Sequence, residues 1–304
     1  MHPLASVVPP SPPGHLEAFV QAFPLMRRLH EACLTPGMLV VAVHDSGVIT
    51  SHAHLVDDGE HAVIGRHARC RLQLTRDPAV ATRHAMVVLA RRGGGVALDA
   101  WAIGPTGMRT EDGLVWGTLT TRAPSAFVIG TTRIFAFPTG PGVPAWTSDP
   151  ATTWAMLPPQ RAPIGTPFPV RPGASFDGDD PTATVDAARA NLRVRAWRIG
   201  GEVQGVLRLV EGEVKAAVPL TDVALERGVH LGRADRCDAG GRFSRLSRLH
   251  AVVLRRDGAV WVYDAASHYG LALDQAPVAR VCLDGGAAVS LGGTLRIAWE
   301  PRAR

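Results

Sequence analysis

The sequence has few cysteines, few aromatic residues and no long hydrophobic run. Cys33, Cys70, Cys237 and Cys282 lack the CxxC spacing of zinc or redox sites, so we expect reduced, buried thiols. Aromatic residues make up 6% of the chain and no stacking motif is interleaved with its arginines, which argues against a nucleic-acid partner. No apolar run approaches the length of a membrane span, and the first residues lack a signal-peptide pattern. These absences predict a cytoplasmic protein with no membrane partner.

Catalytic motifs are also missing. There is no Walker loop, no GxSxG and no HExxH. The glycine triplet at residues 93–95 lies between two apolar segments, which favours a hairpin turn over a nucleotide loop. His52 and His54 form one pair without further ligands at a set spacing, so they do not indicate a metal site. The sequence therefore predicts a protein that is not an enzyme and needs no cofactor or metal.

What the chain does contain is many turn-forming residues. Its 304 residues, long enough for two domains, include 32 glycines and 24 prolines. This composition favours β architecture with an extended linker over a helical bundle. The formal charge of +5 permits acidic partners without demanding nucleic acid.

One stretch, residues 231–271, carries most of the chemistry. Loops at one end of a predicted β framework would present two arginines, a serine hydroxyl and several small residues. Guanidinium forks and a hydroxyl suit a phosphate group, and glycine lets the backbone come close to it. The pattern consists of Gly232 and Arg233, then Ser247, Arg248 and His250, then Asp264, Ser267 and Gly270.

This stretch resembles the forkhead-associated (FHA) domain, a β-sandwich that binds phosphothreonine peptides. The family signature is Gly-Arg after a strand, then Ser-x-x-His, then Asp-x-x-Ser-x-Asn-Gly. Tyr269 departs from it, because it stands where the family usually has the Asn that holds the peptide backbone. The resemblance implies that Arg233 pairs with phosphate oxygens, that Ser247 donates its hydroxyl and that Arg248 adds charge. It implies that Ser267 and Tyr269 border the peptide. The structural motif residues would be Gly232, His250, Asp264 and Gly270.

The first half of the chain repeats this pattern more weakly. Residues 65–70 echo residues 232–237, and residues 84–88 echo residues 250–254. Ala81 stands at the position of the signature serine, and its methyl group cannot donate a hydrogen bond to phosphate. This half also resembles an FHA domain, and we expect structural or protein–protein use there, with weak phosphopeptide binding as the alternative. The candidates for a weak second site are Gly65, Arg66, Thr82, Arg83 and His84.

The predicted fold is all-β, with two FHA-like β-sandwiches joined by a proline-rich linker and a short N-terminal helix. Residues 1–36 would be a disordered start and the helix, which Pro24 should break or kink. Residues 37–139 would form the degenerate FHA-like domain and residues 140–190 the linker. Residues 191–304 would form the FHA domain.

Thr182 and Thr184 lie among acidic residues in the predicted linker and are candidate phosphosites. A phosphorylated linker could occupy the phosphate site of its own chain. An ordinary solvated linker is the alternative interpretation.

The sequence thus predicts a phosphothreonine-dependent adaptor in Ser/Thr kinase signalling. Its partner would be a phosphothreonine-containing protein, such as a kinase or a kinase substrate. The alternative is a scaffold that binds partners without phosphorylation. Ala81 and Tyr269 favour this alternative, whereas the intact Arg233 and Ser247 pair argues against it.

Overall fold

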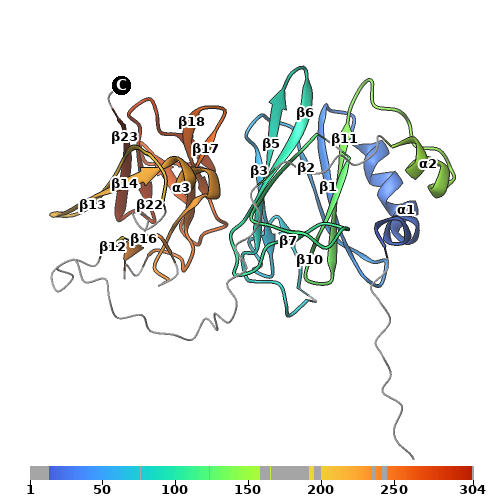
Figure 1. Ribbon diagram of the computed structural model, residues 1–304, viewed down its shortest axis with the longest axis horizontal. Helices are drawn as coiled ribbons and strands as arrows, with labels where there is room; N and C mark the ends of the chain where they lie inside the picture. The colour runs from blue at the N-terminus through green and yellow to red at the C-terminus, as the bar shows by residue number, and fades with distance from the viewer. Residues whose placement is uncertain are drawn as a thin grey trace, which may run out of the picture.

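The computed structural model is mostly β, with two β-sandwiches side by side and two helices on the far side of the first (Figure 1). These helices are α1 (His15–Ala32) and α2 (Pro150–Met156). The predicted fold class, including the short N-terminal helix, is confirmed. The structure describes residues 14–75, 77–122, 124–157, 165, 192–194, 200–234, 237–241 and 245–302.

The first sandwich consists of two sheets whose facing side chains form one core. We call the sheet beneath α1 its outer sheet and the sheet toward the second sandwich its inner sheet. In spatial order, the outer sheet contains β2 (Ile49–Leu55), β1 (Gly37–His44), β11 (Thr132–Thr139), β10 (Ser125–Ile129), β7 (Met108–Arg109) and β8 (Val115–Trp116). The inner sheet contains β4 (Leu72–Gln73), β3 (His61–Gly65), β5 (Ala85–Arg92), β6 (Gly95–Ala102) and β9 (Thr118–Thr121).

Strand β1 is buried on both faces, because alternate side chains of a strand point in opposite directions. Met38 and Val40 enter the core between the two sheets. Leu39 and Val41 point the other way and pack against α1. An uninterrupted apolar run is the sequence pattern of such a strand.

Helix α1 runs without a break through Pro24, so the predicted break at this proline is wrong. Pro24 lies on the exposed side of the helix. On the other side, Phe19, Phe23 and Met26 are buried in one apolar cluster with the outer sheet. This packing stabilises the helix on both sides of the missing backbone donor.

The beginning of the predicted linker is folded against the first sandwich. Trp146 stacks on Phe23 and on His30, with ring centroids 5.8 and 4.5 Å apart. Helix α2 follows, and the side chain of Asp149 caps it by accepting a hydrogen bond from the Thr152 N–H at 2.6 Å. Residues 140–157 therefore do not act as an extended spacer. Thr182 and Thr184 lie outside the described residues.

The second sandwich repeats the two-sheet plan around its own core, to which Leu207, Val253 and Ile297 contribute. A short helix, α3 (Asp222–Arg227), adjoins it. Its inner sheet contains β12 (Leu192–Val194), β16 (Ala239–Gly241), β15 (Val229–Leu231), β17 (Ala251–Arg256), β18 (Ala259–Asp264) and β21 (Arg280–Cys282). Its outer sheet contains β14 (Val214–Thr221), β13 (Val203–Glu211), β23 (Leu295–Pro301), β22 (Ala288–Leu291), β19 (Leu271–Leu273) and β20 (Ala276–Val278).

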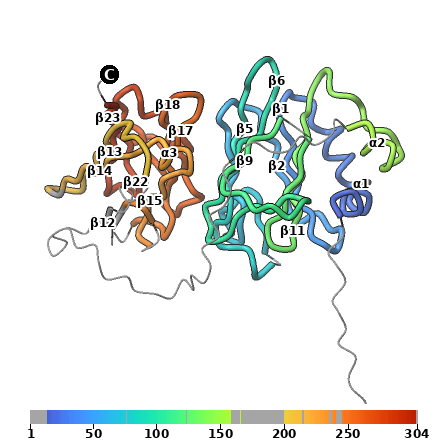
Figure 2. The backbone as a smooth tube through the Cα atoms, viewed as in Figure 1, coloured from blue at the N-terminus to red at the C-terminus, as the bar shows by residue number. Residues whose placement is uncertain are grey.

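The two sandwiches contact each other through their inner sheets (Figure 2). Met86 and Val88 of β5 share a buried apolar cluster with Val252 and Leu254 of β17. Tyr263 of β18 lies in the same cluster and is fully buried. Burial of apolar surface stabilises a contact roughly in proportion to its area. Burial of this apolar cluster therefore stabilises the contact and holds the two sandwiches together as one body.

Hydrogen bonds between the two sandwiches accompany this apolar cluster. Arg83 is buried, and its guanidinium donates hydrogen bonds to the carbonyl oxygens of Ala265, at 2.5 Å, and Ala266, at 2.7 Å. His61 Nε2 donates to the carbonyl oxygen of Asp264 at 2.9 Å. Backbone carbonyls that the contact would otherwise leave without donors are satisfied in this way, which a buried interface requires.

Candidate functional site

The candidate site is built from three loops of the second sandwich. The first loop follows β15 and holds Gly232 and Arg233. Its backbone pairs with the second loop, because the Arg233 N–H donates to Ser247 O at 3.1 Å and the Ala234 N–H to Arg248 O at 3.0 Å. A Cβ atom at Gly232 would overlap the Arg248 carbonyl oxygen, so this close approach requires glycine.

His250 joins the second loop to the third. Its Nδ1 accepts a hydrogen bond from the Ser247 N–H at 3.1 Å, and its Nε2 donates to Gly270 O at 2.9 Å. This pattern requires the neutral ring with its proton on Nε2. Burial is the main cause that lowers the pKa of His250 below the ordinary value, which favours the neutral form. His250 is therefore placed to hold the loops and has no exposed nitrogen for catalysis.

The third loop is held by its own side chains. The Asp264 carboxylate accepts a hydrogen bond from the Ser267 N–H, with distances of 3.3 and 3.2 Å to its two oxygens. Ser267 Oγ accepts from the Gly270 N–H at 2.9 Å. Ser267 is only 4% exposed, so its side chain braces the loop, and its predicted place at the border of the peptide stays a prediction. Tyr269 does reach the surface, being 57% exposed, and the Arg245 guanidinium lies 5.8 Å from its ring centroid.

The predicted phosphate-binding side chains lie on the paired first and second loops. Arg233 and Arg248 are exposed and Ser247 is half-buried. Ser247 Oγ accepts a hydrogen bond from the His268 N–H at 2.9 Å. Since a hydroxyl donates one proton and accepts two hydrogen bonds, this contact leaves the proton of Ser247 for an anion. The second loop thus carries a hydroxyl donor and an arginine, and the first loop paired with it carries another arginine. This combination is suited to a phosphate group.

The first sandwich contains the same backbone arrangement. The Arg66 N–H donates to Ala81 O at 3.1 Å, and the His67 N–H donates to Thr82 O at 3.0 Å. The Ala81 N–H donates to His84 Nδ1 at 3.1 Å, as Ser247 does to His250. The loop scaffold is therefore repeated, while the hydroxyl is replaced by a methyl group.

The arginines near this second set of loops are engaged elsewhere. Arg66 Nε donates to Val80 O at 2.5 Å. Arg83 points into the contact between the sandwiches and is buried, so the prediction that it lies in a weak second site is corrected. His84 Nε2 lies 3.2 Å from Thr106 Oγ1, which keeps the ring inside the loops. Thr82 is half-buried, and Gly65 packs against its carbonyl oxygen.

The sequence did not identify Arg69 as a functional residue. This exposed arginine of the first sandwich reaches the third loop of the second, where its Nη1 donates to Ser267 O at 3.4 Å. The sequence does contain a signal for this residue, because Arg69 belongs to the Gly-Arg-x-x-Arg-Cys pattern that residues 65–70 and 232–237 share. Only the contact between the sandwiches places it beside the candidate site.

Two of the four cysteines have matching structural roles. Cys70 Sγ donates to Thr82 O at 3.4 Å, and Cys237 Sγ donates to Arg248 O at 3.1 Å. Both are buried, and burial raises the pKa of Cys70 to about 11. The thiols of these two residues therefore help to hold the paired loops together.

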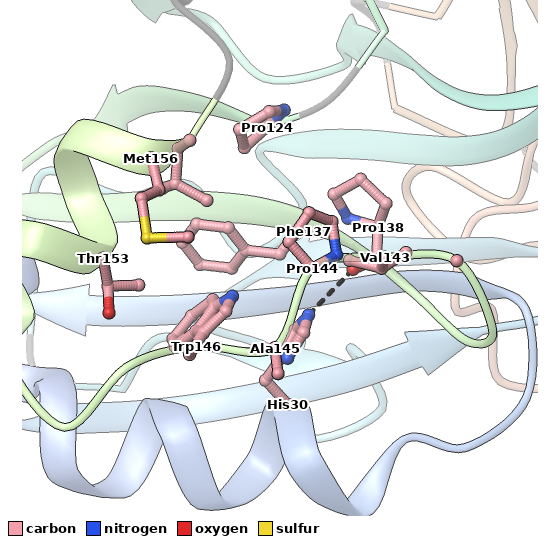
Figure 3. Close-up of a pocket in the computed structure, with 12 residues that line it drawn as sticks. His30, Pro124, Phe137, Pro138, Val143, Pro144, Ala145, Trp146, Thr153 and Met156 are labelled. Atoms are coloured by element: carbon pink, nitrogen blue, oxygen red, sulfur yellow. Dashed lines mark hydrogen bonds between the residues drawn. The ribbon is translucent and has the colours of Figure 1, made fainter.

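A separate apolar cavity of about 170 Å³ lies between the outer sheet and helices α1 and α2 (Figure 3). Trp146 and Phe137 line it, and His30 Nε2 donates to Pro138 O at 2.9 Å at its edge. Burial lowers the pKa of His30, which favours the neutral ring. None of the described residues that line the cavity is an arginine or a lysine, so this lining does not suit a phosphate group.

In the described part of the chain, no group of three or more His, Cys, Asp or Glu residues could hold a metal ion. None of its helices combines the length and the hydropathy that crossing a bilayer requires.

Comparison with known proteins gives a likeness to solved structures alone, since no family model and no curated protein matches the sequence. The Rv1747 FHA-1 domain of Mycobacterium tuberculosis is 22% identical with a TM-score of 0.28, and the match covers 33% of this chain and 99% of that one. The FHA domain of CT664 from Chlamydia trachomatis is 17% identical with a TM-score of 0.29, covering 33% and 96%. Mycobacterium tuberculosis EmbR, solved with a low affinity phosphopeptide, is 20% identical with a TM-score of 0.29, covering 33% and 26%. At these identities and TM-scores the likeness does not indicate a function.

Proposed function

We propose that the chain is an adaptor that binds phosphothreonine-containing proteins through the three loops of its second sandwich. Arg233 would form hydrogen bonds to the phosphate oxygens, Ser247 would donate its hydroxyl, and Arg248 would add charge. A phosphorylated threonine carries about −1.5 to −2 charge near neutral pH and three acceptor oxygens. Its partner would be a Ser/Thr kinase or a kinase substrate.

The observation that carries this proposal is the pairing of the first two loops. The backbone bonds at Arg233 and Ala234 hold Arg233 next to Ser247, and His268 leaves the serine proton free to donate. The first two loops are held by backbone bonds and by the buried side chains of Cys237 and His250, so the exposed arginine side chains remain for a ligand. A site fixed before binding loses less entropy when the ligand arrives.

Calorimetric titration of the full chain with paired phosphothreonine and unphosphorylated peptides from a degenerate library tests the proposal. We expect binding only of the phosphorylated pool. Arg233→Ala should abolish it, and Arg233→Lys should weaken it because an ammonium group cannot form the two-pronged contact. Ser247→Ala should cost about 1–3 kcal/mol, the scale for losing a hydrogen bond to a charged group.

The first sandwich supplies the matched comparison. Arg66→Ala should change phosphopeptide affinity little, because Ala81 gives that set of loops no hydroxyl donor. Ala81→Ser would add the hydroxyl and tests whether those loops gain binding. Equal binding of phosphorylated and unphosphorylated peptides by the wild type would refute phosphate recognition and favour the scaffold alternative.

Regulation by the linker is a separate part of the proposal. Phosphorylation of Thr182 or Thr184 would produce a ligand on the same chain, with an effective concentration on the order of millimolar if the tether spans the distance. If kinase treatment modifies both residues and the affinity for a partner peptide stays the same as in Thr182→Ala/Thr184→Ala, the linker does not compete for the site.

A further inference from the structure

Arg69 of the first sandwich lies beside the candidate phosphate site of the second. Its Nη1 donates to the carbonyl oxygen of Ser267 at 3.4 Å. The N–H of the same peptide group belongs to His268, and it donates to Ser247 Oγ at 2.9 Å. One peptide group therefore connects the Arg69 guanidinium to the Ser247 hydroxyl.

This connection limits the distance between the two groups. Two hydrogen bonds and the width of one peptide unit place Arg69 Nη1 no more than about 9 Å from Ser247 Oγ. An extended peptide advances about 3.3 Å per residue. A side chain one or two residues from a phosphothreonine at Ser247 would therefore lie within reach of Arg69.

The position of Arg69 is fixed by contacts on both sides. The Arg69 N–H donates to His67 Nδ1 at 3.1 Å, which holds the local turn. The bonds from Arg83 to Ala265 and Ala266 hold the neighbouring third loop against the first sandwich. Arg69 itself remains exposed, so its guanidinium has further donors for a ligand.

A second exposed arginine, Arg248 of the second sandwich, lies at the same junction. Burial lowers the pKa of the half-buried His67, and the nearby charges of Arg83, Arg69 and Arg248 lower it further, which favours its neutral ring. The arginines of both sandwiches thus make one positive surface, which favours an anion with more than one charged group.

We propose that the two sandwiches form a composite site in which Arg69 recognises a second negatively charged side chain, within two residues of the phosphothreonine. A second phosphate or a carboxylate meets this requirement. The inference rests on the proposed function, because it needs a phosphothreonine at Arg233 and Ser247. In this composite site the first sandwich contributes to sequence specificity, although its own loops do not bind the phosphothreonine.

The test uses a phosphothreonine peptide that binds the full-length wild type. One residue at −2, −1, +1 or +2 from the phosphothreonine is alanine, glutamate or phosphoserine, and affinities are measured by fluorescence anisotropy. We expect the second charge to tighten binding at one or two of these positions by about fivefold at low salt, and phosphoserine to exceed glutamate. Arg69→Ala should remove this gain, so that the variant binds the acidic and the alanine peptides with affinities within about twofold of each other.

Two further variants sharpen the result. Arg28→Ala removes the same charge from an exposed position of α1, on the side of the first sandwich away from the junction, and should keep the gain (Figure 1). Arg69→Glu should reverse the preference, so that the alanine peptide binds more tightly than the acidic ones. Thermal unfolding of both Arg69 variants checks that the fold is intact.

The outcomes separate this inference from the proposed function. Phosphate-dependent binding without a gain from a second charge at any position, or with a gain that Arg69→Ala retains, overturns the composite site alone. A wild type that binds no phosphothreonine peptide, or binds without regard to phosphate, overturns both. A gain that Arg69→Ala abolishes supports both.

Discussion

Loss of Arg83 should weaken the contact between the two sandwiches. This buried side chain donates hydrogen bonds of 2.5 and 2.7 Å to the carbonyl oxygens of Ala265 and Ala266. A hydrogen bond to a charged group contributes about 1.5–3 kcal/mol, and an unsatisfied buried carbonyl costs about as much. Removal of the guanidinium also ends its own burial cost, so we expect Arg83→Ala to lower the free energy of unfolding by about 3 kcal/mol.

Arg91 provides a matched control. It also donates to two carbonyl oxygens, those of Pro36 at 2.9 Å and Val56 at 2.7 Å, but it is exposed and bonds within its own sandwich. Water can replace such bonds, so Arg91→Ala should change the free energy of unfolding by only about 0.5 kcal/mol. Urea unfolding of the full chain, followed by far-ultraviolet circular dichroism, measures both variants.

Loss of Arg83 should also affect binding. Ala265 and Ala266 begin the third loop, whose His268 N–H orients Ser247, so Arg83→Ala should reduce phosphopeptide affinity although Arg83 lies outside the site. If Arg83→Ala unfolds with the same free energy as Arg91→Ala, the contact contributes little to stability and the two sandwiches are not one body.

Two further predictions concern the loops and the buried histidines. Gly232→Ala should lower phosphopeptide affinity by tenfold or more in anisotropy titrations because its Cβ would push the paired loops apart, whereas Gly285→Ala, which enters open space, should not; equal affinities would contradict the loop geometry. Burial is the main cause that lowers the pKa values of His61, His84 and His250. The folded chain therefore binds fewer protons than the unfolded chain below the ordinary value of 6.5, and the free energy of unfolding should fall as the pH falls below 6.5. Urea midpoints that are higher at pH 5.5 than at pH 7.5 would contradict this sign.

Part of the local geometry of the site could be predicted from the sequence, because the bond between Ser247 and His250 is short-range and glycine indicates a close approach of the backbone. Gly232 is needed where two loop backbones meet, and His250 lies three residues from the serine whose N–H it accepts. Such bonds depend on spacing along the chain, which the sequence displays. The bond between Ser267 and Gly270 was not predicted, because the spacing of Ser267 does not reveal whether its hydroxyl turns outward or back to Gly270.

The contact between the sandwiches is only weakly indicated by the sequence. The segments of β1, β5 and β17 are continuous apolar runs, which is typical of strands buried on both faces. The sequence does not say what covers the second face. In β1 it is a helix, and in β5 and β17 it is the other sandwich.

By itself, the sequence determined the all-β fold and the repeated loop motif, and it is the source of the proposed phosphate-binding role of Arg233 and Ser247, because each depends on residue type and local spacing. Only the tertiary structure decided which residues of the first sandwich serve the second. Arg83 follows a motif residue yet points into the interface, and Arg69 reaches a loop almost two hundred positions away. These placements depend on how two apolar sheet faces pack against each other, and no local pattern specifies the partner or the orientation of such a contact.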